Sequence, residues 1–170
     1  MTTWRGRLIT GAGVAALVAG IGSALSTNIE AATATANLSV TAAVVANCTI
    51  SAGTVAFGTY DPVAANDSTP LDATGTVTVR CTRNTSSMVG LGPGAHFSGG
   101  RRMNDGATEY LSYELYSDPA RTSVWDETNR VAYVAPNRSP QDLTVYGQVP
   151  AGQDVGVGNY ADSVVAEIEF

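Results

Sequence analysis

The sequence contains no lysine, because all nine basic residues among its 170 residues are arginine, and His96 is the single histidine. Fifteen acidic residues outnumber the arginines and give a formal net charge of −6 at pH 7. A protein that binds nucleic acid by neutralising phosphates needs a basic face. The composition therefore predicts that nucleic acid is not a partner.

Residues that could carry catalysis or hold a metal are scarce. Nucleophilic catalysis needs a base beside a serine or cysteine, but His96 lies alone in the glycine-rich stretch 90–100 and no serine has a motif around it. That stretch also lacks the Gly-Lys-Ser/Thr ending of a phosphate-binding loop. We interpret 90–100 as a flexible surface loop and Arg101–Arg102 as a solvated pair or salt-bridge donors. The sequence predicts no enzymatic activity, no metal and no cofactor.

Charged residues are few, at 14%, whereas apolar residues reach 44%. A disordered chain shows the opposite balance, so we expect one folded domain with a core of its own. The chain has 18 glycines and many threonines and valines, but few of the residues that fill exposed helices. This composition favours β structure.

The first 31 residues have the layout of a secretory signal peptide. Arg5 and Arg7 precede a run without charge over residues 8–25, and small residues follow, with Ala-x-Ala matches between Ala31 and Ala36. This order is typical of an export signal, and cleavage is expected between residues 31 and 36. The alternative is a membrane anchor, because the run reaches the lower end of spanning length.

Export changes the interpretation of the two cysteines, Cys48 and Cys81. An exported chain with an even number of cysteines most simply pairs them, and a metal site would want more ligands. We therefore predict a disulfide between them. Closing a loop of about 34 residues stabilises the folded chain by roughly 3.5 to 4 kcal/mol in the chain-entropy model.

After the signal, apolar and polar residues alternate with a period of two in several short segments. From this alternation we predict strands over residues 38–44, 75–81, 110–116, 143–149 and 160–170. Residues 55–60 are also expected to be a strand, because they form a short apolar run closed by the turn signal Asp61-Pro62. Glycine, proline, asparagine and aspartate separate these segments, and no window has a helical period. Strands at this spacing predict an antiparallel sandwich. Strands near both ends of such a domain leave edges that invite pairing with another chain.

The chain from residue 47 to residue 170 resembles the spore-coat-U domain, the pilin module of archaic chaperone–usher fibres. The resemblance is carried, in order along the chain, by Cys48-Thr49-Ile50, Phe57-Gly58-Thr59-Tyr60-Asp61-Pro62, the stretch 70–82, Arg101-Arg102-Met103, the stretches 111–118 and 121–125, Tyr146-Gly147-Gln148-Val149-Pro150-Ala151-Gly152-Gln153, and Gly158-Asn159-Tyr160-Ala161-Asp162. These pieces cover nearly the whole expected mature chain. The resemblance is therefore more specific than any single motif.

The resemblance implies an all-β fold, an incomplete immunoglobulin-like antiparallel sandwich completed by a donor strand from another chain. A periplasmic chaperone would first fill the gap, and the N-terminal strand of the next identical or related pilin subunit would replace it at an outer-membrane usher. Residues 32–46 would be the donor strand, and residues 47–170 the pilin domain. The donor side chains would be Ala36, Leu38, Val40, Ala42 and Val44, and the groove edge and chaperone contact would be Val164, Ala166, Ile168 and Phe170.

The implied function is that of a structural subunit of an extracellular fibre, secreted through the periplasm to the cell surface and serving attachment or biofilm formation. Two alternatives remain at this point. Residues 38–44 could be an ordinary first strand that completes its own sheet. The second alternative is a secreted spore or cell coat protein that is folded and complete as a monomer.

Overall fold

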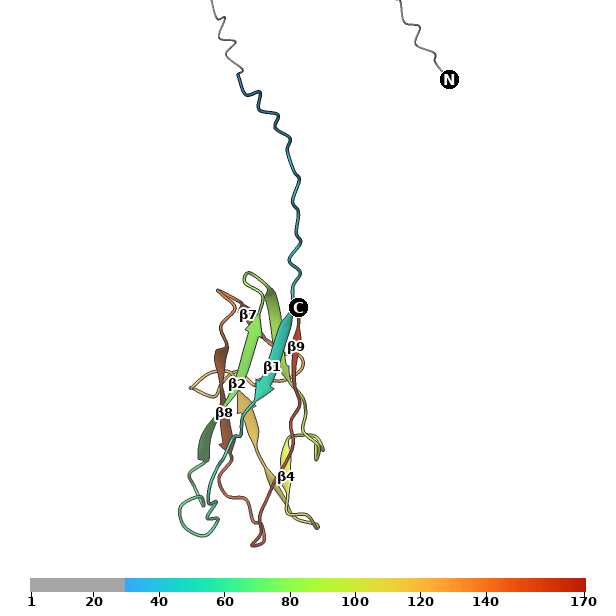
Figure 1. Cartoon of the computed structure of the whole chain (residues 1–170). Coiled ribbons are helices and arrows are strands. Elements are labelled where there is room, and N and C mark those ends of the chain that lie inside the picture. Colours follow the sequence, from blue (N-terminus) through green and yellow to red (C-terminus); the bar gives the residue numbers. More distant parts are fainter. Residues whose placement is uncertain (1–29) are drawn as a thin grey trace, which may run out of the picture. The chain divides into compact units, whose positions relative to one another are not determined.

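The computed structural model describes residues 30–170, so the predicted signal peptide lies almost entirely outside the described residues. Within residues 30–170 the chain is all-β and forms nine strands (Figure 1). They are β1 (Cys48–Ala52), β2 (Leu71–Cys81), β3 (Ser86–Leu91), β4 (Arg102–Asn104), β5 (Tyr110–Ser112), β6 (Glu114–Tyr116), β7 (Val131–Val134), β8 (Gln141–Val149) and β9 (Ala166–Glu169). Every pairing between them is antiparallel. In this described part, no helix is long and apolar enough to cross a membrane.

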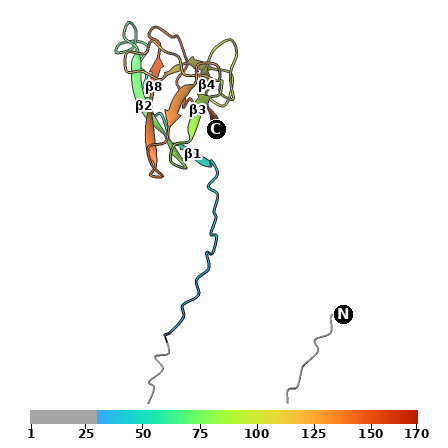
Figure 2. The ribbon, with the colours of Figure 1, turned by 90° about the horizontal axis from the view of Figure 1, so that it is seen from above.

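The strands form two main sheets and one small one. The larger sheet has the order β1-β2-β8-β6, the second has the order β7-β3-β9, and β4 pairs with β5. Figure 2 shows β2 and β8 on one side of the domain and β3 on the other. The chain moves between sheets at Tyr113, which separates β5 from β6 and donates its backbone N–H to the carbonyl of Arg101. The predicted antiparallel sandwich is confirmed.

The core lies between the two main sheets and draws on both. The larger sheet contributes Val77, Val79, Leu115, Val145 and Val149, the second contributes Val89 and Leu91, and Leu111, Tyr113 and Trp125 complete the buried cluster. Alternate residues of β2 and β8 enter this cluster, as a two-residue period requires of strands with one buried face. Trp125 is 1% exposed, and its indole N–H donates to the carbonyl of Val89 at 2.8 Å.

The predicted disulfide between Cys48 and Cys81 is confirmed. Cys48 begins β1 and Cys81 ends β2, and the two residues are partners in the register of that strand pair. The bond therefore joins β1, an edge strand of the larger sheet, to the strand with which it pairs.

Two predicted strands have no counterpart among the described residues. Residues 38–44 belong to a stretch, 30–47, that forms no strand and whose residues are exposed. Residues 55–60 also form no strand, although Val55, Phe57 and Tyr60 are partly buried against the core. Residues 38–44 alternate and residues 55–60 form an apolar run, but a strand is formed by pairing, and neither segment has a backbone partner among the described residues.

Other predicted boundaries were also wrong. The expected loop 90–100 begins two residues later, because Gly90 and Leu91 lie in β3 and are buried. The final strand is shorter than predicted and covers Ala166–Glu169. Strands β3 and β7 were not predicted, and they pair with each other in the second sheet.

Candidate functional site

A groove of about 1040 Å³ opens on the domain between two segments that are far apart in sequence. Residues 52–60, which follow β1, line one side, and residues 155–164, which precede β9, line the other. Its apolar floor is made by Leu71, Met103, Leu111, Tyr113 and Leu115. Three of these floor residues, Leu111, Tyr113 and Leu115, belong to the buried core, so the groove reaches the core at this place.

Both sides of the groove have free backbone groups. Within residues 30–170, no backbone–backbone hydrogen bond involves residues 54–60 or residues 155–160. The two strands that continue these segments are also open along one edge, since β1 pairs only with β2 and β9 pairs only with β3 in this part of the chain. Free N–H and C=O groups along a sheet edge are a template for pairing with an added strand.

Glycines in the central strands β2 and β8 allow residues 52–60, which form one side of the groove, to lie close against the larger sheet. A Cβ atom at Gly147 of β8 would lie 2.8 Å from Phe57 Cζ, and one at Gly75 of β2 would lie 2.5 Å from Val55 Cγ2. Real Cβ atoms do not approach other atoms so closely, so any larger residue would push this segment away. Glycine inside a strand often marks such a close approach, and this was the signal in the sequence that could have located the segment.

A polar cluster lies on the other side of the groove. The carboxylate of Asp162 is 2% exposed, accepts a 2.7 Å hydrogen bond from Tyr113 Oη, and lies 3.0 Å from His96 Nδ1. Although burial raises the pKa of Asp162, hydrogen bonds from Tyr113, Ser163 and His96 outweigh it and hold that pKa below its usual range. Burial, together with the Asp162 carboxylate, raises the pKa of the Tyr113 hydroxyl. Through His96, the cluster connects the glycine-rich loop to the side of the groove that contains Asp162.

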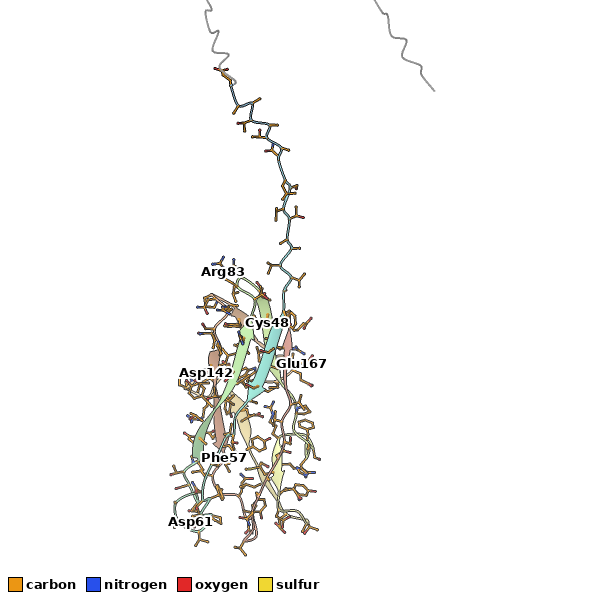
Figure 3. All side chains as sticks on the ribbon, viewed as in Figure 1. Cys48, Phe57, Asp61, Arg83, Asp142 and Glu167 are labelled. Carbon is orange, nitrogen blue, oxygen red and sulfur yellow. A yellow bond between two sulfur atoms is a disulfide. The ribbon has the colours of Figure 1, made fainter. Side chains whose placement is uncertain are left out.

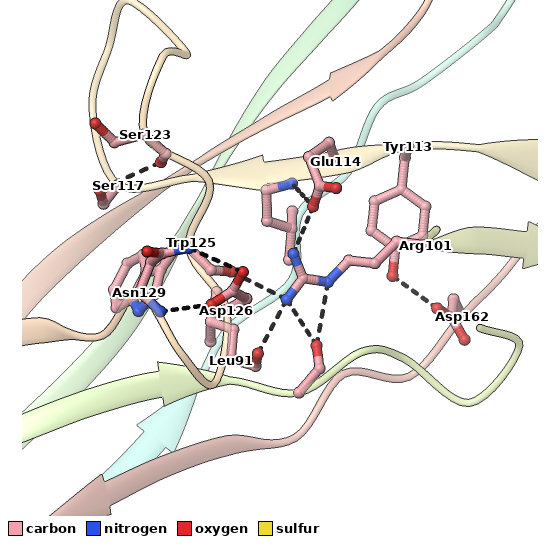
Figure 4. A network of polar contacts seen from close by, with 12 residues as sticks. Leu91, Arg101, Tyr113, Glu114, Ser117, Ser123, Trp125, Asp126, Asn129 and Asp162 are labelled. Atoms are coloured by element: carbon pink, nitrogen blue, oxygen red, sulfur yellow. Dashed lines mark hydrogen bonds and ion pairs between the residues drawn. The ribbon is translucent and has the colours of Figure 1, made fainter. Parts of the chain in front are cut away.

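Arg101, whose carbonyl accepts from the backbone N–H of the floor residue Tyr113, corrects the prediction of a solvated arginine pair. Its side chain is 3% exposed and forms an ion pair with Glu114 at 2.5 Å (Figure 4). The guanidinium also donates to the carbonyls of Leu91, Gly92 and Trp125. A buried charge needs such a complete set of partners, and the alternative of a salt-bridge donor was the correct one. No sequence pattern around Arg101 indicates these carbonyls, which lie nine, ten and 24 positions away.

The predicted groove-edge residues occupy different places. Val164 lines the groove, whereas Ala166 and Ile168 lie in β9 and pack partly buried against the core. Phe170 is 55% exposed and lies at a smaller depression formed with Val44, Val45 and residues 82–86. The donor residues Ala36, Leu38, Val40, Ala42 and Val44 are all exposed. The groove is also lined by residues 52–60 and 155–160, which were not predicted as site residues.

A family model described as the Spore Coat Protein U domain matches residues 34–167. The chain belongs to the Spore Coat Protein U domain family. It is also 41% identical over 172 residues to "Protein U" of Myxococcus xanthus, a match that covers 92% of this chain and 96% of that protein. This match extends the family relationship over nearly the whole chain.

A solved structure has the same fold as this family member. The structure is a CsuC–CsuE chaperone–tip adhesion subunit pre-assembly complex from archaic chaperone–usher Csu pili of Acinetobacter baumannii. The match has a TM-score of 0.54 and 23% sequence identity, and it covers 75% of this chain. This chain spans 40% of the length of the matched chain. At this identity the similarity establishes the fold.

Proposed function

We propose that this protein is a structural subunit of an extracellular chaperone–usher fibre, in which residues 32–46 of one copy pair with the groove of the next copy. The observation that carries the proposal is the open backbone on both sides of the groove, at residues 54–60 and 155–160. An added strand would pair with these groups and cover the apolar floor. This mode of recognition uses backbone hydrogen bonds for affinity and alternate side chains for specificity.

The segment 32–46 has suitable chemistry for this role. It contains no charged residue, and its apolar side chains at Leu38, Val40 and Val44 are exposed. Burying each Leu or Val contributes about 1.5 to 3 kcal/mol, and each backbone hydrogen bond adds about 1 kcal/mol net. Donor and groove are different surfaces, so the contact is heterologous and propagates as a filament.

The proposal also covers the route to the fibre. Residues 1–31 would direct export and be removed between residues 31 and 36, a periplasmic chaperone would hold the groove, and an outer-membrane usher would exchange the chaperone for the next subunit. The similarity in fold to a subunit described in complex with a chaperone supports these partners. Assembled fibres at the cell surface would serve attachment or biofilm formation.

Processing of the exported chain is simple to test because the sequence contains no lysine. The only primary amine of such a chain is its α-amino group. An amine-reactive mass tag on the exported protein should therefore label one peptide, beginning between residues 32 and 37. A label on Met1 or on a residue after Cys48 would contradict the proposed donor segment.

The donor role itself is tested with substitutions on opposite faces of the segment. Leu38→Asp combined with Val40→Asp places charges at the side chains that would enter the groove, and should abolish SDS-resistant ladders of exported subunits. The matched control, Ser39→Asp with Thr41→Asp, adds the same charge to the other face and should leave ladders in place. Ladders unaffected by the first pair would contradict the proposal. A natural chain that stays monomeric and folded would instead support a coat protein complete as a monomer.

A further inference from the structure

Unpaired acidic side chains gather at one end of the domain, which we call the acidic end. The loops at this end are joined, since Gly152 N–H donates to the Asn66 carbonyl at 2.8 Å, and the loop 105–109 packs beside Gly156 and Gly158. The loops 53–70, 105–109 and 150–160 contain no basic residue. The acidic side chains that they carry are Asp61, Asp67, Asp105, Glu109 and Asp154.

Unpaired arginines gather at the opposite end, which we call the basic end and define by Arg80, Arg83 and Arg138. Arg80 Nε donates to the Arg138 carbonyl at 2.9 Å, and all three side chains are exposed. Figure 3 labels Arg83 and Asp61 at opposite ends of the domain. Glu169 also lies toward the basic end, where it is paired with Arg130.

The separation of charge is not explained by ion pairs inside the subunit. Among the described residues, Arg101, Arg121 and Arg130 each form an ion pair with a carboxylate. None of the three arginines of the basic end and none of the five acids of the acidic end does so in this part of the chain. Both sets are therefore available to another molecule.

We propose that the acidic end of one copy docks against the basic end of the next copy, and that this contact sets the direction in which subunits join. The inference rests on the proposed fibre. Val44 is four residues before Cys48, so an inserted donor ends at most about 14 Å from the start of β1. β1 starts at the basic end of the copy that supplies the donor. That basic end therefore lies next to the end of the neighbouring groove at which the donor leaves.

One end of the groove lies at the acidic end of the domain, and the other points toward the basic end. Pro62 and Val157 line it beside the acidic end, and β1 and β9 continue it toward the basic end. A donor that leaves at the acidic end brings opposite charges together, whereas one that leaves at the basic end brings arginines against arginines. Exposed apolar side chains lie at both ends, with Val63 and Val157 at one and Val134 and Phe170 at the other. Charge complementarity of this kind steers encounter and suppresses the wrong orientation.

The test uses exported chains with charges exchanged at one end or at both ends. Arg83→Asp with Arg138→Asp makes the chain more negative, and Asp67→Arg with Asp154→Arg makes it less negative. The first pair leaves one arginine and two aspartates at the basic end, so that like charges meet, and should slow formation of SDS-resistant ladders at low salt by about tenfold. The second pair leaves three acids and two arginines at the acidic end, which weakens the attraction without reversing it, and should slow ladder formation less. The chain carrying all four substitutions has the natural composition and net charge, but acids then outnumber arginines by one at both ends. It should therefore form ladders more slowly than the natural chain and faster than the variant with Arg83→Asp and Arg138→Asp.

Salt provides the second measurement. Differences between the variants should shrink as salt rises, because the Debye length is about 8 Å at 0.15 M ionic strength. If Asp67→Arg with Asp154→Arg accelerates ladders, the rate follows net charge and the docking contact is refuted. The same holds if the fourfold variant, which has the natural net charge, forms ladders at the natural rate. Failure of the proposed fibre is distinguishable, because the natural chain would then form no ladder at any salt concentration.

Discussion

Tyr113 Oη donates a hydrogen bond to Asp162 across the floor of the groove, at 2.7 Å. The two residues are 49 positions apart in sequence, and His96 joins the same carboxylate from the glycine-rich loop. One buried carboxylate therefore holds together the floor of the groove, one of its sides and the neighbouring loop.

Replacing Asp162 by Asn should destabilise the domain and change its response to acid. The folded pKa of Asp162 is lowered, so its carboxylate stabilises the fold above its unfolded pKa of about 3.9. That contribution is lost as pH falls through the lower folded pKa. Urea unfolding should show a loss of about 2 kcal/mol at neutral pH for Asp162→Asn, and a shallower decline of stability in acid. Asp154→Asn, which changes an exposed carboxylate, is the control, and equal losses in the two variants would contradict this role.

Gly147→Ala should disturb the side of the groove formed by residues 52–60. The added Cβ would lie 2.8 Å from both Phe57 Cζ and Val55 Cγ1, so both side chains must move. We expect a loss of about 1 to 3 kcal/mol in the free energy of unfolding. Gly100→Ala is the matched control because a Cβ there meets nothing within 4 Å. Combining Gly147→Ala with Phe57→Ala should cost less than the sum of the two single losses, and strict additivity would mean that the proposed clash is absent.

Arg101→Met should be among the most destabilising single substitutions in the chain. It leaves the carbonyls of Leu91, Gly92 and Trp125 without their donor and Glu114 without its cation. Breaking a buried ion pair by removing one partner costs about 3 to 5 kcal/mol. Arg138→Met at an exposed position should change the unfolding free energy by about 0.5 kcal/mol or less. Thermal unfolding measures the Tm of both variants. A Tm for Arg101→Met close to that of the natural chain would contradict the prediction.

The sequence predicted the parts of the fold that depend on local pattern. Strands β2 and β8 alternate in sequence, and the burial of Val77, Val79 and Val145 follows that alternation. The disulfide followed from an even number of cysteines in a chain expected to be exported.

The groove could not be predicted in the same way. Residues 55–60 form an apolar run typical of a strand, but their backbone is unpaired among the described residues, because pairing depends on a neighbour that local pattern does not contain. Gly90 was interpreted as part of a loop because glycine usually marks loops, yet its lack of a side chain allows Arg130 and the Asp126 carbonyl to approach β3. Arg101 is indistinguishable from a surface arginine until the carbonyls around it are known.

The central claim is that the backbone of residues 54–60 and 155–160 is unpaired in the single subunit and becomes paired by a donor strand. Hydrogen–deuterium exchange of these amides, in single subunits and in SDS-resistant assemblies of the exported chain, measures this directly. We predict fast exchange at both segments in the single subunit, and strong protection of both in the assembly, with the amides of β2 protected in each. Amides of residues 54–60 and 155–160 that exchange slowly in the single subunit, or that remain fast in the assembly, would contradict the account.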